Sequence, residues 1–164
     1  MPTLSATAPN PMTGYLTWIG LRPHREAAML SVETAWVDPT KGLLGDRAGA
    51  SSNRNRKISL IQEDHLYLIA ERLGRAVTAD LTRRNLVIRG LDLHSLRKQS
   101  FRIGSVILTG TGLCHPCPRM NLRLGPGGLA AMGGLGGITA AVVSGGQIRL
   151  GDEVSLQQSD LFEC

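Results

Sequence analysis

Cys117 is the residue whose type and surroundings point most clearly to chemistry. It lies in the stretch CHPCPR, residues 114–119. A thiolate is both a nucleophile and a soft metal ligand, and a nearby positive charge favours the thiolate form. Arg119 can supply that charge. The alternative is a small buried apolar residue, which is a common role for a free cysteine. The local sequence alone leaves both interpretations open.

Other chemistries fit the sequence less well. Cys114 and Cys117 have the spacing of a thioredoxin-like redox pair, but the sequence that follows becomes glycine-rich instead of forming the helix of a βαβ unit. A structural zinc site usually needs four ligands in two close pairs, and only Cys114, His115 and Cys117 cluster. Residues 125–130 fit a dinucleotide-binding pattern, yet no acidic residue follows at the ribose-binding distance and no helical pattern follows the glycines.

Length and composition indicate a globular domain. The chain has 164 residues, of which 42% are hydrophobic and 19% charged, enough to bury a core in one domain. We predict a flexible leader over residues 1–14, a single domain over 15–158 and a short tail over 159–164. Residues 1–14 lack the basic and apolar regions of a secretory signal, and no apolar run is long enough to cross a bilayer. Three irregularly spaced cysteines favour a reducing compartment, so we expect a cytoplasmic protein that does not bind membranes.

The charge balance favours an anionic ligand. The formal net charge is +5 and the isoelectric point is about 9.6. Aromatic residues make up only 4% of the chain, and the one dense basic run is Arg54-Asn55-Arg56-Lys57. Few aromatic platforms and no long basic stretch disfavour sequence-specific nucleic-acid binding.

The secondary-structure signals are mostly those of strands. Alternating or β-branched runs bounded by Gly, Pro and Asn cover residues 15–21, 31–37, 57–61, 86–88, 101–109, 140–143, 147–150 and 153–156. Apolar residues recur at helical spacing over residues 62–73, which Gly74 can terminate. Seven glycines in residues 125–137 predict a loop, and residues 144–146 predict a tight hairpin turn. We predict a mainly β fold, a β-rich barrel with one or two short helices.

A series of short polar motifs along the chain resembles the MOSC domain family. This domain occurs at the C-terminus of molybdenum cofactor sulfurases, in mitochondrial amidoxime-reducing enzymes and as single-domain bacterial proteins, and the last type is the most similar. The resemblance covers about residues 29 to 156. It rests on the order of six motifs: Gly45-Asp46-Arg47, Arg56-Lys57-Ile58-Ser59-Leu60-Ile61, Arg83-Arg84-Asn85-Leu86, Phe101-Arg102-Ile103-Gly104, His115-Pro116-Cys117 and Gly151-Asp152-Glu153-Val154.

The resemblance implies a barrel that binds the molybdenum cofactor, a pterin with a dithiolene and a phosphate tail. Cys117 matches the family's invariant cysteine, which is associated with sulfur transfer or molybdenum ligation. Arg84 and Asn85 are the first candidates for cofactor contact, because arginine can bind an anion in bidentate fashion and asparagine can hydrogen-bond a pterin ring. Further candidates are Arg47, Arg56, Ser59, Arg83 and Arg119, and we expect Arg56 and Ser59 to share one face of a strand.

Several of these residues have a simpler structural interpretation. Successive strand residues point to opposite faces, so we expect Arg83 or Arg84 to be a solvated surface charge. We expect Asp46 to brace Arg47 or a turn, and Asp152 to shape the turn before the last strand.

Three functions follow from these observations. In the first, a molybdenum ion bound by Cys117 removes oxygen from a small N-hydroxylated substrate. In the second, Cys117 carries a persulfide for the assembly of metal–sulfur cofactors. In the third, a non-catalytic module binds an anion. The chain has no pyridoxal-phosphate lysine region and too few cysteines for a plant-type iron–sulfur module, so we expect an electron-donor protein or a cysteine desulfurase as partner.

Overall fold

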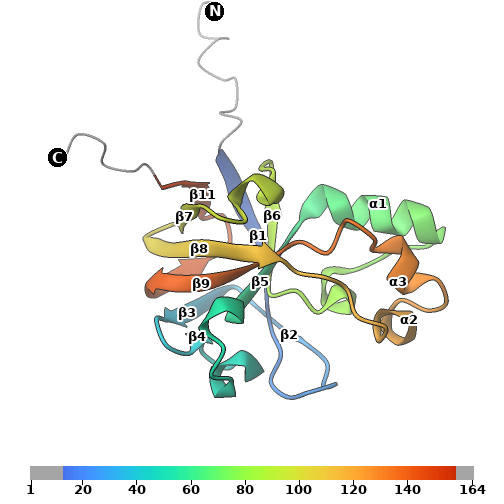
Figure 1. Ribbon diagram of the computed structural model, residues 1–164, viewed down its shortest axis with the longest axis horizontal. Helices are drawn as coiled ribbons and strands as arrows, with labels where there is room; N and C mark the ends of the chain where they lie inside the picture. The colour runs from blue at the N-terminus through green and yellow to red at the C-terminus, as the bar shows by residue number, and fades with distance from the viewer. Residues whose placement is uncertain (1–12, 158–164) are drawn as a thin grey trace, which may run out of the picture.

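A closed seven-stranded barrel is the centre of the computed structural model, which describes residues 13–157 (Figure 1). Neighbouring strands follow the order β11-β7-β8-β9-β5-β6-β1, and pairing of β11 with β1 closes the sheet. The predicted β-rich barrel is confirmed. The strands are β1 (Thr13–Leu21), β5 (Ile58–Gln62), β6 (Leu86–Arg89), β7 (Ser100–Ile103), β8 (Val106–Leu113), β9 (Ile138–Ser144) and β11 (Glu153–Leu156). Most of the predicted leader, the predicted tail and Cys164 lie outside the described residues.

Two predicted strands are each divided in the structure. The segment predicted over 31–37 forms β2 (Leu30–Val32), which pairs with β1, and β3 (Thr34–Asp38), which joins β4 (Gly42–Leu43) and β10 (Gly146–Arg149) in a separate three-stranded sheet. The segment predicted over 101–109 forms the hairpin of β7 and β8. Its turn contains Gly104 at φ 58°, a left-handed conformation that glycine adopts without strain.

The predicted hairpin turn at residues 144–146 is wrong. β9 ends at Ser144 and β10 begins at Gly146, but the two strands do not pair with each other. β9 pairs with β5 and β8 in the barrel, whereas β10 pairs with β3 in the smaller sheet. A side chain at Gly145 would overlap the backbone of Val37. Gly145, which has no side chain, therefore lets the chain run close to the backbone of Val37 as it passes from the barrel to the smaller sheet.

Helices cover one side of the barrel (Figure 1). The predicted helix is confirmed as α1 (Glu63–Leu73), which ends at Gly74 with φ 73°. Two single-turn helices follow: α3 (Gly128–Ala131) packs against α1, and α2 (Met120–Arg123) packs against α3. The loop predicted over residues 125–137 is wrong over α3, where the missing side chain of Gly128 allows close contact with the backbone of α2. No helix among residues 13–157 is long and apolar enough to span a membrane. The 3-10 helices are η2 (Arg47–Ala50), η3 (Arg54–Arg56), η4 (Ala79–Thr82) and η5 (Leu93–Leu96).

Two apolar clusters flank the parallel pair β5 and β6, which α1 connects. Leu60 and Leu86 face the barrel interior, whereas Ile61 and Val87 face the cluster under the helices. Alternation along a strand sends neighbouring side chains to opposite faces, and a strand buried on both faces is apolar throughout. This pair is therefore fixed from both sides. The polar residues at its ends, including Ser59 on β5, are held in defined positions.

His65 on α1 makes stability sensitive to acid. Its ring meets that of His94 at a centroid distance of 5.8 Å, and its Nδ1 is buried without a hydrogen-bond partner among the described residues. Burial lowers the pKa of His65. The unfolded chain, whose histidine titrates near pH 6.5, therefore binds a proton first, so stability falls as the pH drops through about 6.5.

Replacing His65 with Gln removes this titration. We expect urea unfolding of wild type to lose more free energy between about pH 7.5 and 5.5 than unfolding of His65→Gln. His24→Gln, at an exposed position, is the matched control and should follow wild type. Parallel profiles for wild type and His65→Gln would contradict this interpretation.

Candidate functional site

An open cavity of about 320 Å³ lies where loops and strand ends meet beside β5. Its volume is within the range of small-molecule sites, about 300–1,000 Å³. Eight of the chain's fifteen arginines line it, together with one carboxylate, Glu26. The lining residues are Arg22, Arg25, Glu26, Arg47, Arg56, Ser59, Arg83, Arg84, Cys114, His115, Cys117, Arg119, Met120, Arg123 and Thr139.

The structure brings the predicted site residues together, with one exception. Seven of the eight line this single cavity although they come from distant parts of the chain: Arg47, Arg56, Ser59, Arg83, Arg84, Cys117 and Arg119. Asn85 is the exception, because it lies in the layer beneath the cavity. This cavity, with its eight arginines, is a candidate site for the anionic ligand that the net charge predicts.

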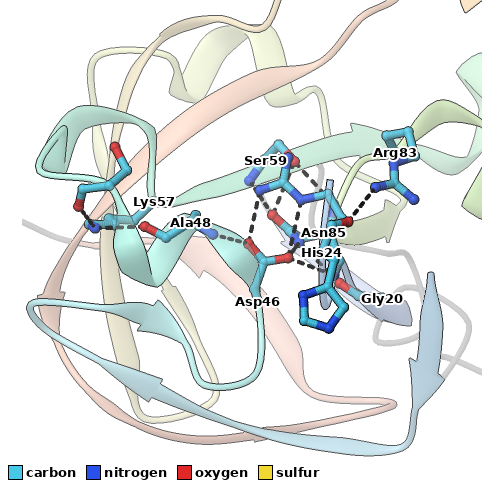
Figure 2. A network of polar contacts seen from close by, with 10 residues as sticks. Gly20, His24, Asp46, Ala48, Lys57, Ser59, Arg83 and Asn85 are labelled. Atoms are coloured by element: carbon cyan, nitrogen blue, oxygen red, sulfur yellow. Dashed lines mark hydrogen bonds and ion pairs between the residues drawn. The ribbon is translucent and has the colours of Figure 1, made fainter. Parts of the chain in front are cut away.

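Asp46 is the centre of the network that supports the cavity floor (Figure 2). Its carboxylate accepts the backbone N–H of Arg22 at 2.7 Å and the guanidinium of Arg22 at 2.9 and 3.1 Å. It also accepts the N–H of Ala48 at 3.0 Å and the Nδ2 of Asn85 at 3.0 Å. The sequence predicted that Asp46 braces Arg47 or a turn. It caps η2, which begins at Arg47, and its side-chain ion pair is with Arg22.

The ionised form of Asp46 is stabilised by these partners. Burial alone would raise the pKa of Asp46, but the hydrogen bonds and charge of Arg22, together with the N–H of Ala48, hold that pKa below its usual value. The side chain has no solvent-exposed surface. The buried negative charge of Asp46 therefore neutralises the guanidinium charge of Arg22, one of the arginines in the wall.

Asn85 is fully buried, and all its hydrogen-bonding capacity is used within the protein. Its Oδ1 accepts from the backbone N–H and the hydroxyl of Ser59, both at 3.1 Å. Its Nδ2 donates to the carbonyl of Gly20 and to Asp46, both at 3.0 Å. The arrangement connects β1, β5 and η2. It favours a positioning role for Asn85 over the predicted direct contact with a ligand.

Arg84 forms a buried link between the end of η4 and two loops. It is 6% exposed, and its guanidinium donates to the carbonyls of Gly136 at 2.7 Å, Thr82 at 3.1 Å and Cys114 at 3.2 Å. Burial lowers the pKa of Arg84, although the charge of the nearby Cys114 sulfur acts in the opposite direction. A side chain at Gly136 would overlap the Cys114 carbonyl. Glycine there lets Arg84 clamp the cysteine loop.

The expectation that Arg83 or Arg84 is a solvated charge is wrong, because both are buried. They do not lie in a strand: η4 ends at Thr82, Arg83 adopts a left-handed φ of 62°, and β6 begins only at Leu86. Arg83 donates to the carbonyls of Ala27 and, at 3.4 Å, of His24. Burial lowers the pKa of Arg83, and neighbouring arginines lower it further. The two arginines therefore both face inward by leaving the alternation of a strand.

Arg56 and Ser59 reach the cavity by a different route from the predicted one. The predicted common strand face is wrong, because β5 begins at Ile58 and Arg56 lies in η3. Residues three apart on a strand would also point to opposite faces. The hydroxyl of Thr111 on β8 holds the carbonyl of Asn55, which fixes η3 beside the cavity. Thr111 also contacts the lining residue Thr139 at 2.8 Å.

The cysteine loop forms one edge of the cavity. Cys117 is exposed and Cys114 is buried, and both are free thiols that line the wall. Arg119 is not free, because it forms an ion pair with Glu26. Among residues 13–157, no group of three or more His, Cys, Asp and Glu side chains is placed to hold a metal ion. A metal at Cys117 therefore needs most of its ligands from another molecule.

Sequence reasoning missed one wall of the cavity. Arg22, Arg25 and Glu26 follow β1 in a basic loop, and Arg123 lies on α2. The cluster of charges directly after a predicted strand was a visible signal, but no motif marked it. Glu26 and Arg83 are the two non-glycine residues with positive φ among those described, and both line the cavity. Such conformations often occur at functional sites.

Most of the wall arginines lack a carboxylate partner. Within residues 13–157 the ion pairs are Arg22–Asp46 and Arg119–Glu26. Six lining arginines therefore have no acidic partner in the part of the chain described. A cluster of like charges around a cavity attracts counter-ions, so the wall is suited to a polyanionic ligand.

Glu26 competes with such a ligand for Arg119. We expect Glu26→Gln to raise the affinity for inorganic pyrophosphate by about twofold to fivefold, because an exposed ion pair contributes up to about 1 kcal/mol. Isothermal titration calorimetry at low salt measures this effect. The control is Glu33→Gln, which removes an exposed carboxylate away from the cavity and should change the affinity little. An unchanged or lower affinity for Glu26→Gln would contradict the competition.

Solved structures of bacterial proteins share this fold. The YuaD protein from Bacillus subtilis superposes with a TM-score of 0.77 at 19% identity, over 91% of this chain and 98% of that chain. YiiM from Geobacillus stearothermophilus superposes with a TM-score of 0.70 at 17% identity, over 90% of this chain and 77% of that chain. YiiM from Escherichia coli superposes with a TM-score of 0.67 at 16% identity, over 88% of this chain and 70% of that chain. At these identities the likeness shows the fold alone.

The family is established from the sequence itself. No curated protein sequence matches the chain at a significant level. The family model of the MOSC domain, however, matches residues 41–155. That range runs from β4 to β11 and includes most of the cavity wall, from η2 to the cysteine loop. Together with the closed barrel and the arginine-lined cavity, this match shows that the chain belongs to the MOSC domain family.

Proposed function

We propose that the arginine-lined cavity binds the molybdenum cofactor and that Cys117 is a thiolate ligand of its metal. The observation that carries the proposal is an exposed thiol at the edge of a cavity lined by eight arginines. The MOSC domain family is associated with the molybdenum cofactor in general. The proposal extends this association to specific residues of this chain.

The chemistry of the wall fits this cofactor. A phosphate tail requires cationic hydrogen-bond donors, and arginine offers a planar pair of N–H groups that matches phosphate oxygens. A soft thiolate suits a metal that also has sulfur ligands. No further cluster of protein ligands surrounds Cys117 among residues 13–157. A site with a single protein ligand suits a cofactor that binds the metal through its own dithiolene, because the protein then adds only one sulfur.

The proposed reaction is the reduction of an N-hydroxylated substrate. The N–O bond breaks, two electrons and two protons are taken up, and the oxygen leaves as water. When bound, the cofactor supplies the two-electron chemistry. The protein binds the anionic tail through arginines such as Arg47 and Arg56, which have no acidic partner within residues 13–157, while Asp46 and Asn85 hold the floor of the cavity. Residues 13–157 contain only two cysteines, too few for an iron–sulfur cluster, and we propose an electron-donor protein as the source of the electrons.

Two substitutions separate cofactor binding from chemistry. In a host that makes the cofactor, Cys117→Ser should retain pterin through the arginines but lose reduction of an N-hydroxylated amidine, because serine is a poor soft-metal ligand. Arg56→Gln should instead lower the pterin content. Arg102→Gln is the matched control, because Arg102 is exposed on β7 and its one side-chain partner among residues 13–157 is Gln157. Pterin fluorescence and substrate turnover measure the two effects.

These measurements also test a plain anion-binding module. If Cys117→Ser changed neither turnover nor metal content while Arg56→Gln abolished anion binding, the cavity would serve binding alone. Equal pterin in Arg56→Gln and Arg102→Gln would contradict the proposed cofactor site.

A second candidate function follows from the exposure of Cys117. An exposed thiol can receive a sulfur atom from a partner protein, whereas a buried one cannot. In this function Cys117 carries a persulfide from a cysteine desulfurase to a metal–sulfur cofactor.

Mass spectrometry after incubation with a desulfurase and cysteine would show one added sulfur on the peptide that contains Cys117. The same peptide from Cys117→Ser should remain unmodified. Sulfur addition to wild type together with no bound molybdenum would favour the carrier over the reductase, whereas an unmodified wild-type peptide would exclude the carrier.

A further inference from the structure

A second thiol lies in the wall of the same cavity as Cys117. Cys114 is 6% exposed, Cys117 is exposed, and both are free. Cysteines separated by two residues commonly form disulfides in redox proteins. We propose that Cys114 is the resolving thiol of Cys117: when Cys117 is oxidised, Cys114 forms a disulfide with it. This step goes beyond the proposed function, because it needs neither the cofactor nor a substrate.

The backbone of the loop holds Cys114 at both its N–H and its carbonyl, whereas among the described residues Cys117 is held at its carbonyl alone, which accepts from the N–H of Met120 at 2.9 Å. The N–H of Cys114 donates to the carbonyl of Gly137 at 2.8 Å, and the carbonyl of Cys114 accepts from Arg84 at 3.2 Å. The backbone N–H groups of His115 and Cys117 donate to no residue within 13–157. Rotation of the Cys117 side chain toward Cys114 therefore breaks no hydrogen bond of the N–H groups of His115 and Cys117, and the carbonyl of Cys117 can keep its bond to Met120.

The two cysteines lie among the arginines of the cavity wall. Arg84 donates to the carbonyl of Cys114 at 3.2 Å, and seven further arginines line the same cavity. Cys117 is exposed, so a small oxidant can reach its sulfur. Thiolates react with peroxides and attack oxidised sulfur.

The chemistry balances with hydrogen peroxide as the oxidant. The Cys117 thiolate attacks one peroxide oxygen, the O–O bond breaks, and hydroxide leaves, so sulfur is oxidised by two electrons to a sulfenic acid. The Cys114 thiolate then attacks that sulfur. An S–S bond forms, the S–O bond breaks, and hydroxide leaves with the proton from Cys114 as water. A dithiol reductant restores both thiols.

The disulfide would protect Cys117 from further oxidation. A sulfenic acid that is not resolved is oxidised further to sulfinic acid, which is irreversible without a dedicated enzyme. The disulfide also removes the one exposed thiol of the cavity wall. The role differs from that of thioredoxin, because the helix that follows Cys117 is the single turn α2. Cys114 therefore acts as a local reserve thiol and not as part of a disulfide-exchange enzyme.

Peptide mapping of the full chain tests the proposal. The background variant Cys164→Ser leaves Cys114 and Cys117 as the two cysteines. Both lie in one tryptic peptide, residues 103–119, so the disulfide appears as the loss of two hydrogens from that peptide. We expect this mass after treatment with hydrogen peroxide, together with resistance to alkylation and full reversal by dithiothreitol.

The control adds Cys114→Ser to the same background. There we expect the peptide to gain oxygen atoms on Cys117, in place of losing two hydrogens, and to react with dimedone at the sulfenic stage. If this variant fails to fold, the background protein alone decides the question. Oxygen on Cys117 beside an alkylated Cys114 would overturn the proposal, and so would a peptide that peroxide leaves unchanged. Neither measurement depends on molybdenum, so failure here is distinct from failure of the cofactor proposal.

Discussion

A buried carboxylate beneath a cluster of arginines is the interaction on which the cavity depends. Asp46 joins the loop after β1, the start of η2 and the residue before β6 through Arg22, Ala48 and Asn85. Like charges in a low-dielectric interior repel strongly, and a buried charge is stable only with an oppositely charged partner and hydrogen bonds. Asp46 supplies these for Arg22, while most other guanidinium groups of the wall face the cavity without an acidic partner among the described residues. The fold thus places positive charge where an anion can neutralise it.

The barrel supplies the rigidity that this cluster requires. β5 and β6 are packed on one face by the barrel interior and on the other by the helices, so Ser59 and Asn85 meet at a fixed register. Arg84 connects the carbonyl of Cys114 to that of Gly136, and Lys57 donates to the carbonyls of Ala48 in η2 and of Ser51 directly after it. Loops carry the site, but buried polar groups hold each loop to a strand. Arginines from distant parts of the chain can therefore share one cavity.

The sequence predicted the barrel, the helix α1 and the family, and it selected residues that line one cavity. Local patterns are strong where apolar residues alternate or follow a helical period. They fail where tertiary contacts decide. The left-handed conformation of Arg83 turns both it and Arg84 inward, and the glycines at 145 and 146 connect two sheets in place of a hairpin. The charges of Arg22 and Glu26 after a predicted strand could be seen in the sequence, but their roles could not be assigned from it, because only the folded chain brings their loop to the cysteine loop.

The functional interpretation of Cys117 depends on the arginines around it. A free, exposed thiol is unremarkable alone, but at the edge of a cavity lined by eight arginines it can complete the coordination of a metal in an anionic cofactor. The most direct test is the molybdenum and pterin content of the wild-type protein purified without chelators from a host that makes the cofactor. The account predicts that both co-elute with the folded protein in equal amounts. A folded protein that carries neither would contradict it.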